Sequence, residues 1–269
     1  MAAASFRKLS VRLSSASLGR RRCRSSSQVS PPGGSAAYCR VVFKAPTAVQ
    51  VRVTLQEIEP PIWRRLIVPR TFHLGELHQV VQAAFGWWDY HLHEFQIGGL
   101  SFSDPDLVKP EFEGDPRVYD ESEVQLLDFS RGDDINFVYV YDFGDDWHHL
   151  VEFEQLLVVE PAPRVARCVD GARARPPEDV GGAHGYTGFL ESLADRRHPE
   201  HADFKRWVGG HFDPEWFDLK LCDRDVRRAL TSNRPIRLKQ PRPRRVPSAP
   251  PTVKRVDVAA RISDVDSHE

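Results

Sequence analysis

Acidic residues are missing from the first 52 positions of this 269-residue chain, where ten basic residues fall. The four cysteines form no C-x-x-C pair, which argues against a zinc ribbon and against the disulfide framework of a small secreted domain. A reduced intracellular compartment fits this cysteine usage best. No apolar run reaches the ~18 residues that a helix needs to span a bilayer, so an integral membrane protein is not expected.

Charge is divided unevenly along the chain. Residues 231–269 hold nine basic and four acidic residues, and removing both ends from the totals of 37 basic and 38 acidic residues leaves 18 and 34 in the middle. This net charge of −16 repels phosphate backbones and attracts cations or basic partners. We therefore expect neither nucleic acid nor membrane as a partner of the middle. A DNA contact through the basic C-terminal segment remains open, and its residues would be Arg234, Arg237, Lys239, Arg242, Arg244 and Arg245.

The first ~40 residues are rich in Arg, Ser and Ala, a composition typical of an organellar transit peptide. A disordered extension has the same composition, and the apolar core of a secretory signal is absent. We expect a cytoplasmic protein, with an organelle as the alternative if this segment is a transit peptide.

Hydrophobic periodicity predicts a series of strands followed by helices. Alternate apolar residues from Val49 to Leu55 share one face of a strand, whereas apolar residues from Leu74 onward recur at helical steps. Gly86 lies where a helix C′ glycine is expected, and Asp223 is the expected cap of the last helix. Residues 103–123 are predicted to form a surface loop. Strands are predicted at 49–58, 62–68, 91–97, 135–141, 147–159 and 165–169, and helices at 71–85, 186–194, 201–208 and 223–230.

Together these elements predict the fold class. Strands with hairpin-like joins, followed by helices, indicate a single α+β domain at 46–230 with a mostly antiparallel or mixed sheet flanked by helices. The polar, low-complexity ends at 1–45 and 231–269 are predicted to be disordered basic tails.

The segment Y-D-F-G-D-D-W-H-H, residues 141–149, is the strongest candidate for a site. Asp142, Asp145 and Asp146 lie at a turn between two predicted strands, and His149 falls on an aromatic, buried side where an imidazole needs a partner. In one interpretation, the aspartates satisfy the amides of the turn and His149 hydrogen-bonds in the core. In the other, carboxylates and imidazole hold a divalent metal ion or ligand, or act as general acid and base.

A pair of histidines precedes this turn in the sequence. His91 and His93, two residues apart, are predicted to project from one strand face, where two imidazoles can share a metal or simply pack. Convergence with His149 and an aspartate would resemble a mononuclear zinc, iron or manganese site. The predicted metal ligands are His91, His93, Asp142, Asp146 and His149.

The segment P-P-E-D-V-G-G-A-H-G-Y, residues 176–186, is the second candidate. Prolines stiffen the chain before Glu178 and Asp179, and the glycines after them permit positive φ. The adjacent acids argue against a phosphate-binding loop. The functional interpretation is a loop that tucks Glu178 or Asp179 towards the aspartate turn, and the structural one is a rigid connection.

Six segments in this order resemble the plasmid pRiA4b ORF-3-like family. They are IWRRLIVP (62–69), LGELHQVVQAAFGW (74–87), HLHEF (91–95), YDFGDDWHH (141–149), PPEDVGGAHGY (176–186) and HFDPEWFD (211–218). The resemblance implies an α+β fold with helices flanking the sheet. It implies no established activity, since the family is largely uncharacterised and is found on plasmids, in chromosomes and beside insertion sequences. The basic N-terminal extension departs from the family pattern.

Positions that match the family motifs define the predicted ligand pocket. Its residues are His91, Asp142, Asp145, Trp147, His149, Glu178, Asp179 and Tyr186.

Three functions follow as hypotheses. The leading one is a binding or interaction module with an acidic His/Asp pocket, because no serine nucleophile elbow, Walker loop or H-E-x-x-H motif is present. The second is a metal-dependent enzyme, for example a hydrolase that uses a metal-activated water. The third is a mobile-element accessory protein that binds DNA through its basic tail. A divalent metal ion is the one cofactor suggested.

Overall fold

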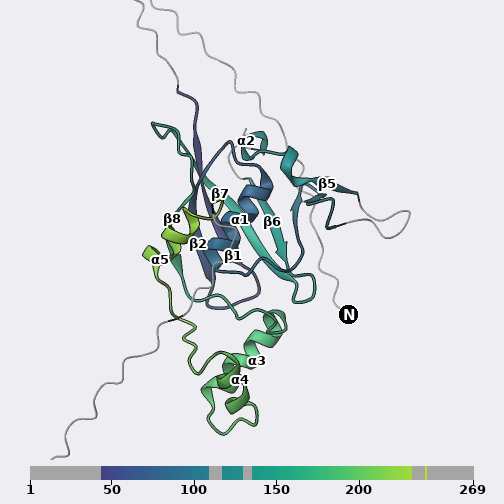
Figure 1. Cartoon of the computed structure of the whole chain (residues 1–269), viewed down its shortest axis with the longest axis vertical. Helices are drawn as coiled ribbons and strands as arrows, with labels where there is room; N and C mark the ends of the chain where they lie inside the picture. The colour runs from purple at the N-terminus through teal and green to yellow at the C-terminus, as the bar shows by residue number, and fades with distance from the viewer. Residues whose placement is uncertain (1–43, 109–116, 130–134, 232–239, 241–269) are drawn as a thin grey trace, which may run out of the picture. The chain divides into compact units, whose positions relative to one another are not determined.

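The structure is a computed structural model that describes residues 44–108, 117–129, 135–231 and 240 (Figure 1). The two predicted tails lie almost wholly outside these residues, as do the six basic residues named for DNA contact, and the domain boundaries at 46 and 230 stay predictions. Within the described part of the chain, no helix has both the length and the apolar character needed to cross a membrane.

The core of the fold is one eight-stranded sheet in the order β5-β4-β3-β6-β7-β1-β2-β8. Neighbouring strands are antiparallel except for the parallel pair β4–β5, so the sheet is mixed. This confirms the predicted α+β class. The strands are β1 (Ala48–Leu55), β2 (Ile62–Pro69), β3 (His93–Ile97), β4 (Leu100–Ser103), β5 (Val118–Asp120), β6 (Asn136–Tyr141), β7 (Trp147–Leu157) and β8 (Arg167–Ala172).

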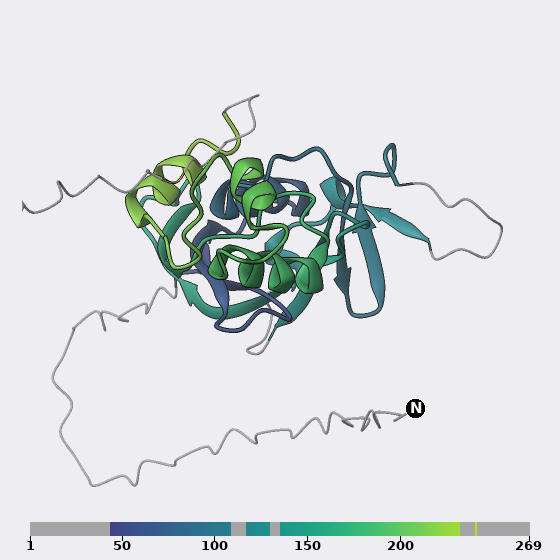
Figure 2. The same ribbon diagram turned by 90° about the horizontal axis from the view of Figure 1, so that it is seen from below.

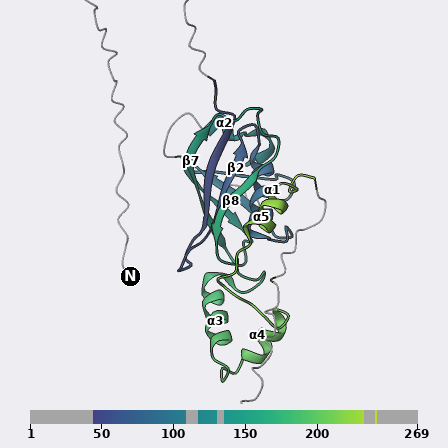
Figure 3. The ribbon, with the colours of Figure 1, turned by 90° about the vertical axis from the view of Figure 1, so that its left-hand side faces the viewer.

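Helices flank this sheet. In Figure 3, α1 and α5 lie on one side of the strands, and α3 and α4 lie beyond the strand ends. Seen from below in Figure 2, α3 and α4 pass in front of the sheet. The helices are α1 (Leu74–Phe85), α2 (Leu126–Phe129), α3 (Gly182–Ala194), α4 (His201–Trp207) and α5 (Leu219–Val226), with a 3₁₀ turn η1 (Glu121–Glu123).

Helix α1 has defined signals at both ends. The side chain of His73 accepts a hydrogen bond from the Glu76 amide, and the Glu76 carboxylate accepts one from the His73 amide. This reciprocal cap fixes the start at Leu74, three residues later than predicted, because His73 is itself non-helical. Gly86 ends the helix at φ 79° and donates to the Gln82 carbonyl, which confirms its predicted role.

Three other predicted boundaries are wrong. Strand β3 begins at His93 rather than His91, so the alternation of faces does not extend back to His91. Part of the predicted loop forms β5 and η1, because β5 pairs with the edge of β4. Helix α3 begins at Gly182, four residues before its predicted start.

The predicted cap of the last helix is also wrong. The carboxylate of Asp218 accepts from the Leu221 amide and caps α5, which therefore begins at Leu219. Asp223 lies inside this helix, and its carboxylate instead receives the guanidinium of Arg167 at 2.7 Å and the amide of Cys168 at 3.1 Å. It joins α5 to β8 rather than starting α5.

A buried cation ties the layers together. Arg64 occupies an inward position of β2 and is 2% exposed, although its neighbours on that face are apolar. Among the described residues its guanidinium has no carboxylate partner, and it donates to four backbone carbonyls instead. These oxygens belong to Trp63, Ala84, Ala172 and Arg173, at 2.8 to 3.0 Å. Because they come from β2, α1, β8 and the residue after β8, one side chain satisfies acceptors on three elements.

We expect Arg64→Lys to lower the free energy of unfolding by ~2–4 kcal/mol, because an ammonium cannot reach all four carbonyls and a buried charge is left poorly solvated. Urea unfolding measures this loss. The matched control is Arg65→Lys on the same strand, since Arg65 faces outward to Glu154 and Asp170. An exposed pair of this kind contributes ~0–1 kcal/mol. Equal losses in both variants would contradict the role given to Arg64.

Candidate functional site

The turn between β6 and β7 directs one carboxylate oxygen of the buried Asp142 towards His91. These two strands are antiparallel, as the sequence predicted. Asp142 adopts φ 60°, a left-handed conformation that aspartate tolerates better than most residues. Its Oδ1 atom accepts hydrogen bonds from the amides of Gly144 at 3.0 Å and Asp145 at 3.3 Å. The turn thus consumes Oδ1 and leaves Oδ2 to face His91.

The segment that opens α3 lies directly against this turn. The Asp145 carboxylate accepts from the Gly181 amide at 3.1 Å. Gly182 has φ 67°, and a Cβ atom there would come 2.5 Å from the Asp145 carbonyl oxygen. A Cβ on Gly185 would come 2.1 Å from the Val180 carbonyl oxygen. Only glycine permits these approaches, which place residue 179 opposite residue 142.

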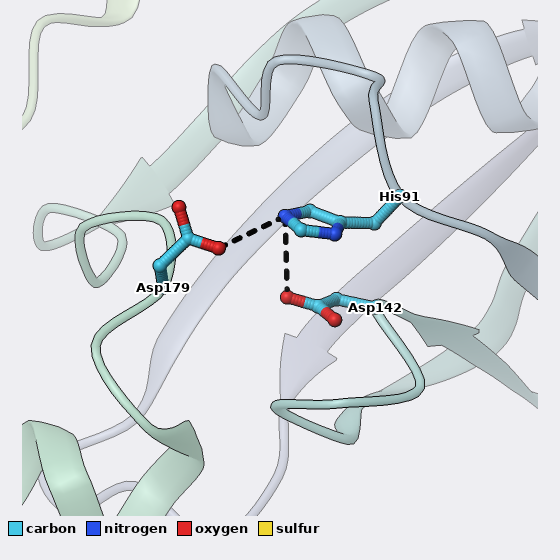
Figure 4. Close-up of side chains that lie close together, drawn as sticks. All are labelled: His91, Asp142 and Asp179. Atoms are coloured by element: carbon cyan, nitrogen blue, oxygen red, sulfur yellow. Dashed lines mark ion pairs between the residues drawn. The ribbon is translucent and has the colours of Figure 1, made fainter.

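His91, Asp142 and Asp179 form the cluster that results. The His91 Nε2 atom lies 3.4 Å from Asp142 Oδ2 and 3.3 Å from Asp179 Oδ1. Figure 4 shows this nitrogen directed between the two carboxylates, with one residue from each of three segments far apart in the sequence. One ligand atom from each residue lies within 4.8 Å of the others.

The His91 Nε2 atom has no hydrogen-bond partner among the described residues, although it is buried. Its two carboxylate neighbours are near enough for electrostatic attraction but are not in hydrogen-bonding geometry. In a tetrahedral site with metal–ligand bonds of ~2.1 Å, two ligand atoms lie ~3.4 Å apart. The two distances from His91 Nε2 match this separation.

Tyr90 orients the exposed member of the cluster. Its hydroxyl donates to Asp179 Oδ2 at 3.0 Å, and its ring packs against the His91 ring with centroids 4.3 Å apart. Burial raises the pKa of Tyr90, and its bond to Asp179 adds to this effect, so the hydroxyl remains a donor. Asp179, like Asp142, thus has one oxygen held by the protein and one directed at His91. Sequence reasoning missed Tyr90, whose one signal is its position next to His91.

Glu178 lies beside the cluster in a different environment. It is 4% exposed, and its Oε1 atom accepts from the Trp88 amide at 2.7 Å. Its Oε2 atom has no hydrogen-bond partner among the described residues, and the Arg175 guanidinium remains 4.0 Å from the carboxylate. Burial raises the pKa of Glu178, although the charge of Arg175 opposes the shift.

His149 lies apart from the cluster, contrary to its place in the predicted metal set. Its Nε2 atom accepts from the Trp87 indole at 3.2 Å, and its Nδ1 atom lies 3.2 and 3.1 Å from the carbonyls of Tyr139 and Trp147. Both nitrogens are therefore engaged, with the proton on Nδ1. Full burial lowers the pKa of His149 to about 3, so the ring is neutral and structural.

His93 and Asp146 also lie apart from the cluster. The His93 ring stacks on His78 with centroids 3.5 Å apart, and its Nε2 atom bonds Glu121 at 2.8 Å. It separates from His91 because only His93 belongs to the strand. Asp146 is exposed and bonds His148 at 2.9 Å. Of the five predicted metal ligands, the structure brings together only His91 and Asp142.

Of the other residues of the predicted pocket, some lie at or beside the cluster and some belong to the hydrophobic core. Asp179 completes the cluster, Asp145 holds the loop and Glu178 lies beside it. Trp147 packs against Trp87 with ring centroids 5.8 Å apart, and buried Tyr186 packs against Phe189 at 6.2 Å. These two aromatic residues are core rather than cluster.

Comparisons with known proteins agree with the motifs. The family model described as plasmid pRiA4b ORF-3-like protein matches residues 47–221. The uncharacterized protein y4hQ of Sinorhizobium fredii (strain NBRC 101917 / NGR234) is 39% identical over 166 residues, which cover 61% of this chain and 81% of that relative. A crystal structure of a protein of unknown function, MM3350 from Methanosarcina mazei Go1, is similar at 36% identity and a TM-score of 0.57. That likeness covers 66% of this chain and 98% of the other.

We expect Gly182→Ala to destabilise the protein by ~2 kcal/mol or more, because the new methyl group meets the Asp145 carbonyl at a positive φ. Thermal and urea unfolding measure the loss. Gly188→Ala in the same helix is the control, since a Cβ there meets nothing within 4 Å. Alanine at that helical position is expected to be neutral or to stabilise by ~0.5–1 kcal/mol. A Gly182 variant as stable as the Gly188 variant would contradict the packing described.

His149 should make stability depend on pH. Its pKa falls from 6.5 in the unfolded chain to about 3 in the folded one, so between these values the unfolded chain binds the extra proton. Stability is therefore full above pH ~6.5 and falls as pH drops towards ~3, by up to ~1.4 kcal/mol per pH unit for one proton. Urea unfolding from pH 7 to pH 4.5 should give a flatter profile for His149→Gln than for the wild type. Parallel profiles would contradict a neutral, buried His149.

Proposed function

Because the chain belongs to the plasmid pRiA4b ORF-3-like family, whose relatives compared above carry no stated activity, we propose a function from the cluster itself. The domain is a metal-dependent binding module that holds a divalent ion through His91, Asp142 and Asp179. The observation that carries this proposal is the buried His91 Nε2 atom, which lies 3.3 and 3.4 Å from two carboxylate oxygens and hydrogen-bonds to neither.

The ligand atoms of the cluster limit which metal ions it would bind. One imidazole and two carboxylates suit zinc, iron or manganese, whereas calcium and magnesium prefer ligands that are all oxygen. The two aspartates carry the charge that balances the ion, and the excess of acidic residues in the middle of the chain favours cation binding. Hydrogen bonds to the second oxygen of each carboxylate orient the ligands, as is usual around bound metals.

A metal-dependent hydrolase is the second candidate. Three protein ligands leave at least one coordination position for water or substrate, which is the arrangement of catalytic rather than structural zinc sites. A divalent ion in such a site lowers the pKa of a coordinated water towards ~7 and so supplies a nucleophile.

Metal binding is tested with Zn²⁺ and Mn²⁺ by isothermal titration calorimetry, and with elemental analysis of the purified full chain. We expect one ion per chain, and more than ~10-fold weaker binding in His91→Gln and Asp142→Asn, because even residues outside the ligand shell change affinity by that factor. Asparagine keeps the oxygen that accepts from the turn amides, so Asp142→Asn isolates the lost charge. The control is His148→Gln, which removes an imidazole paired with Asp146 in the same turn but outside the cluster.

Unchanged affinity in both cluster variants, or no binding by the wild type, would refute the metal proposal. The same metal-loaded samples separate the two candidates when assayed on p-nitrophenyl esters and phosphoesters. Turnover that is lost in His91→Gln favours the hydrolase, and metal binding without turnover favours the binding module.

A further inference from the structure

Gln240 is held against a segment that lies 27 residues before it in the chain. Its Oε1 atom accepts a hydrogen bond from the Asp213 amide at 2.6 Å, and its Nε2 atom donates to the Asp213 carbonyl at 2.9 Å. One side-chain amide thus pairs with both backbone groups of a single residue, as a neighbouring strand would. Asp213 belongs to the segment H-F-D-P-E-W-F-D, residues 211–218, which contributes nothing to the metal cluster.

A cavity of about 500 Å³ lies beside this contact, and Gln240 is part of its lining. Aromatic side chains line the same cavity and retain exposed surface, which a segment of chain could cover. They are Trp88, Trp207, Phe212, Trp216 and Phe217. Residue 241 follows Gln240 directly, and consecutive Cα atoms are only about 3.8 Å apart. The chain beyond Gln240 therefore starts at the cavity.

The residues that follow Gln240 have the composition that such a surface binds. Residues 241–245 read P-R-P-R-R, with two prolines, three arginines and no acidic residue. Proline-rich segments dock on aromatic grooves, because their backbone is already extended and loses little entropy on binding. Arginine stacks on aromatic rings and pairs with carboxylates. Segment 211–218 holds three acidic residues and no lysine or arginine, so the two segments are complementary in charge.

We propose that this cavity is the docking site of the chain's own segment at residues 241–245, with Gln240 as the anchor. The prolines cover the aromatic side chains, and the arginines face the acidic residues of segment 211–218. The site is thus filled within one chain, and another proline- and arginine-rich peptide enters only by displacing this segment. The proposal goes beyond the metal-binding function and needs no bound ion.

Competition between the chain's own segment and a free peptide tests the proposal. A fluorescent peptide of residues 238–247 is titrated with the full-length protein and followed by fluorescence anisotropy. We expect the wild type to bind it about tenfold or more weakly than a full-length variant with glycine and serine at residues 240–245, because a tethered segment competes at high effective concentration. The same replacement at residues 256–261 is the control and should bind as weakly as the wild type. Equal affinities of the wild type and the 240–245 variant, or no binding by that variant, would overturn the proposal.

Two further changes locate the peptide, both measured with the 240–245 variant. A Gln240→Ala peptide should bind about tenfold more weakly, because it loses both hydrogen bonds to Asp213. Trp207→Leu in the protein should weaken the peptide by a similar factor, since Trp207 is 48% exposed and lines the cavity. Trp63→Leu, on the outward face of β2, is the matched control and should change nothing. Peptide binding that survives both changes would place the peptide elsewhere and refute the docking site.

Sedimentation velocity separates the chain's own segment from that of a second copy. The wild type is expected to remain a monomer as its concentration rises. A dimer that forms with rising concentration and disappears in the 240–245 variant would assign the segment to a partner copy and contradict the intramolecular contact.

The docking and metal proposals fail separately. His91→Gln should lose metal and leave peptide binding unchanged, because His91 does not line the cavity. The 240–245 variant should lose the competition and keep its metal. Loss of peptide binding in His91→Gln would show that the docking site depends on the cluster, which contradicts its independence of the ion.

Discussion

The β6–β7 turn and the start of α3 meet where Gly182 lies against the Asp145 carbonyl and the Asp145 carboxylate holds the Gly181 amide. The two segments are far apart in the sequence, and this contact sets their relative position. Asp142 and Asp179 both adopt left-handed backbone conformations, which are unfavourable for residues with side chains unless the surroundings hold them. The glycine contact supplies that constraint, and without it the two carboxylates would not face the same imidazole.

Three other histidines in this region are structural. His78, His93 and His149 each hydrogen-bond to protein groups, so their nitrogens are committed to holding α1, β3, β6 and β7 together. Burial lowers the pKa values of His78 and His149, which keeps both rings neutral and suited to this structural role. His91 differs because it precedes its strand and so escapes the pattern of the sheet. Because His91 lies outside the strand, its Nε2 atom has no hydrogen-bond partner among the described residues and can bind an ion.

The sequence was sufficient for the fold class and for much of the strand pattern. Alternation from Val49 to Leu55 identified a strand face that is fully buried, and the position of Gly86 identified the end of α1. Period-two reasoning also placed His149 on a buried face. It could not name the partners of His149, which are an indole and two backbone carbonyls. Such partners are set by packing and leave no local signal.

The cluster itself was only half predictable. The motifs pointed to Asp142, His91 and Asp179, but pairing His91 with His93 assumed a strand that in fact starts two residues later. The aromatic residues that line the cavity of about 500 Å³ beside Glu178 were less predictable still, since they come from two stretches far apart in the sequence, 85–88 and 207–217.

The glycines at the start of α3 limit which positions of this protein can change during evolution. At Gly182 and Gly185 any side chain would collide with backbone oxygen, so neither position can be used to tune what the protein recognises. The aromatic residues that line the cavity beside Glu178 can be substituted more freely, because several of their side chains are partly exposed and border open space. Descendants of this scaffold would therefore acquire new preferences by exchanging the rings that follow α4, while the carboxylate frame beside them stays rigid.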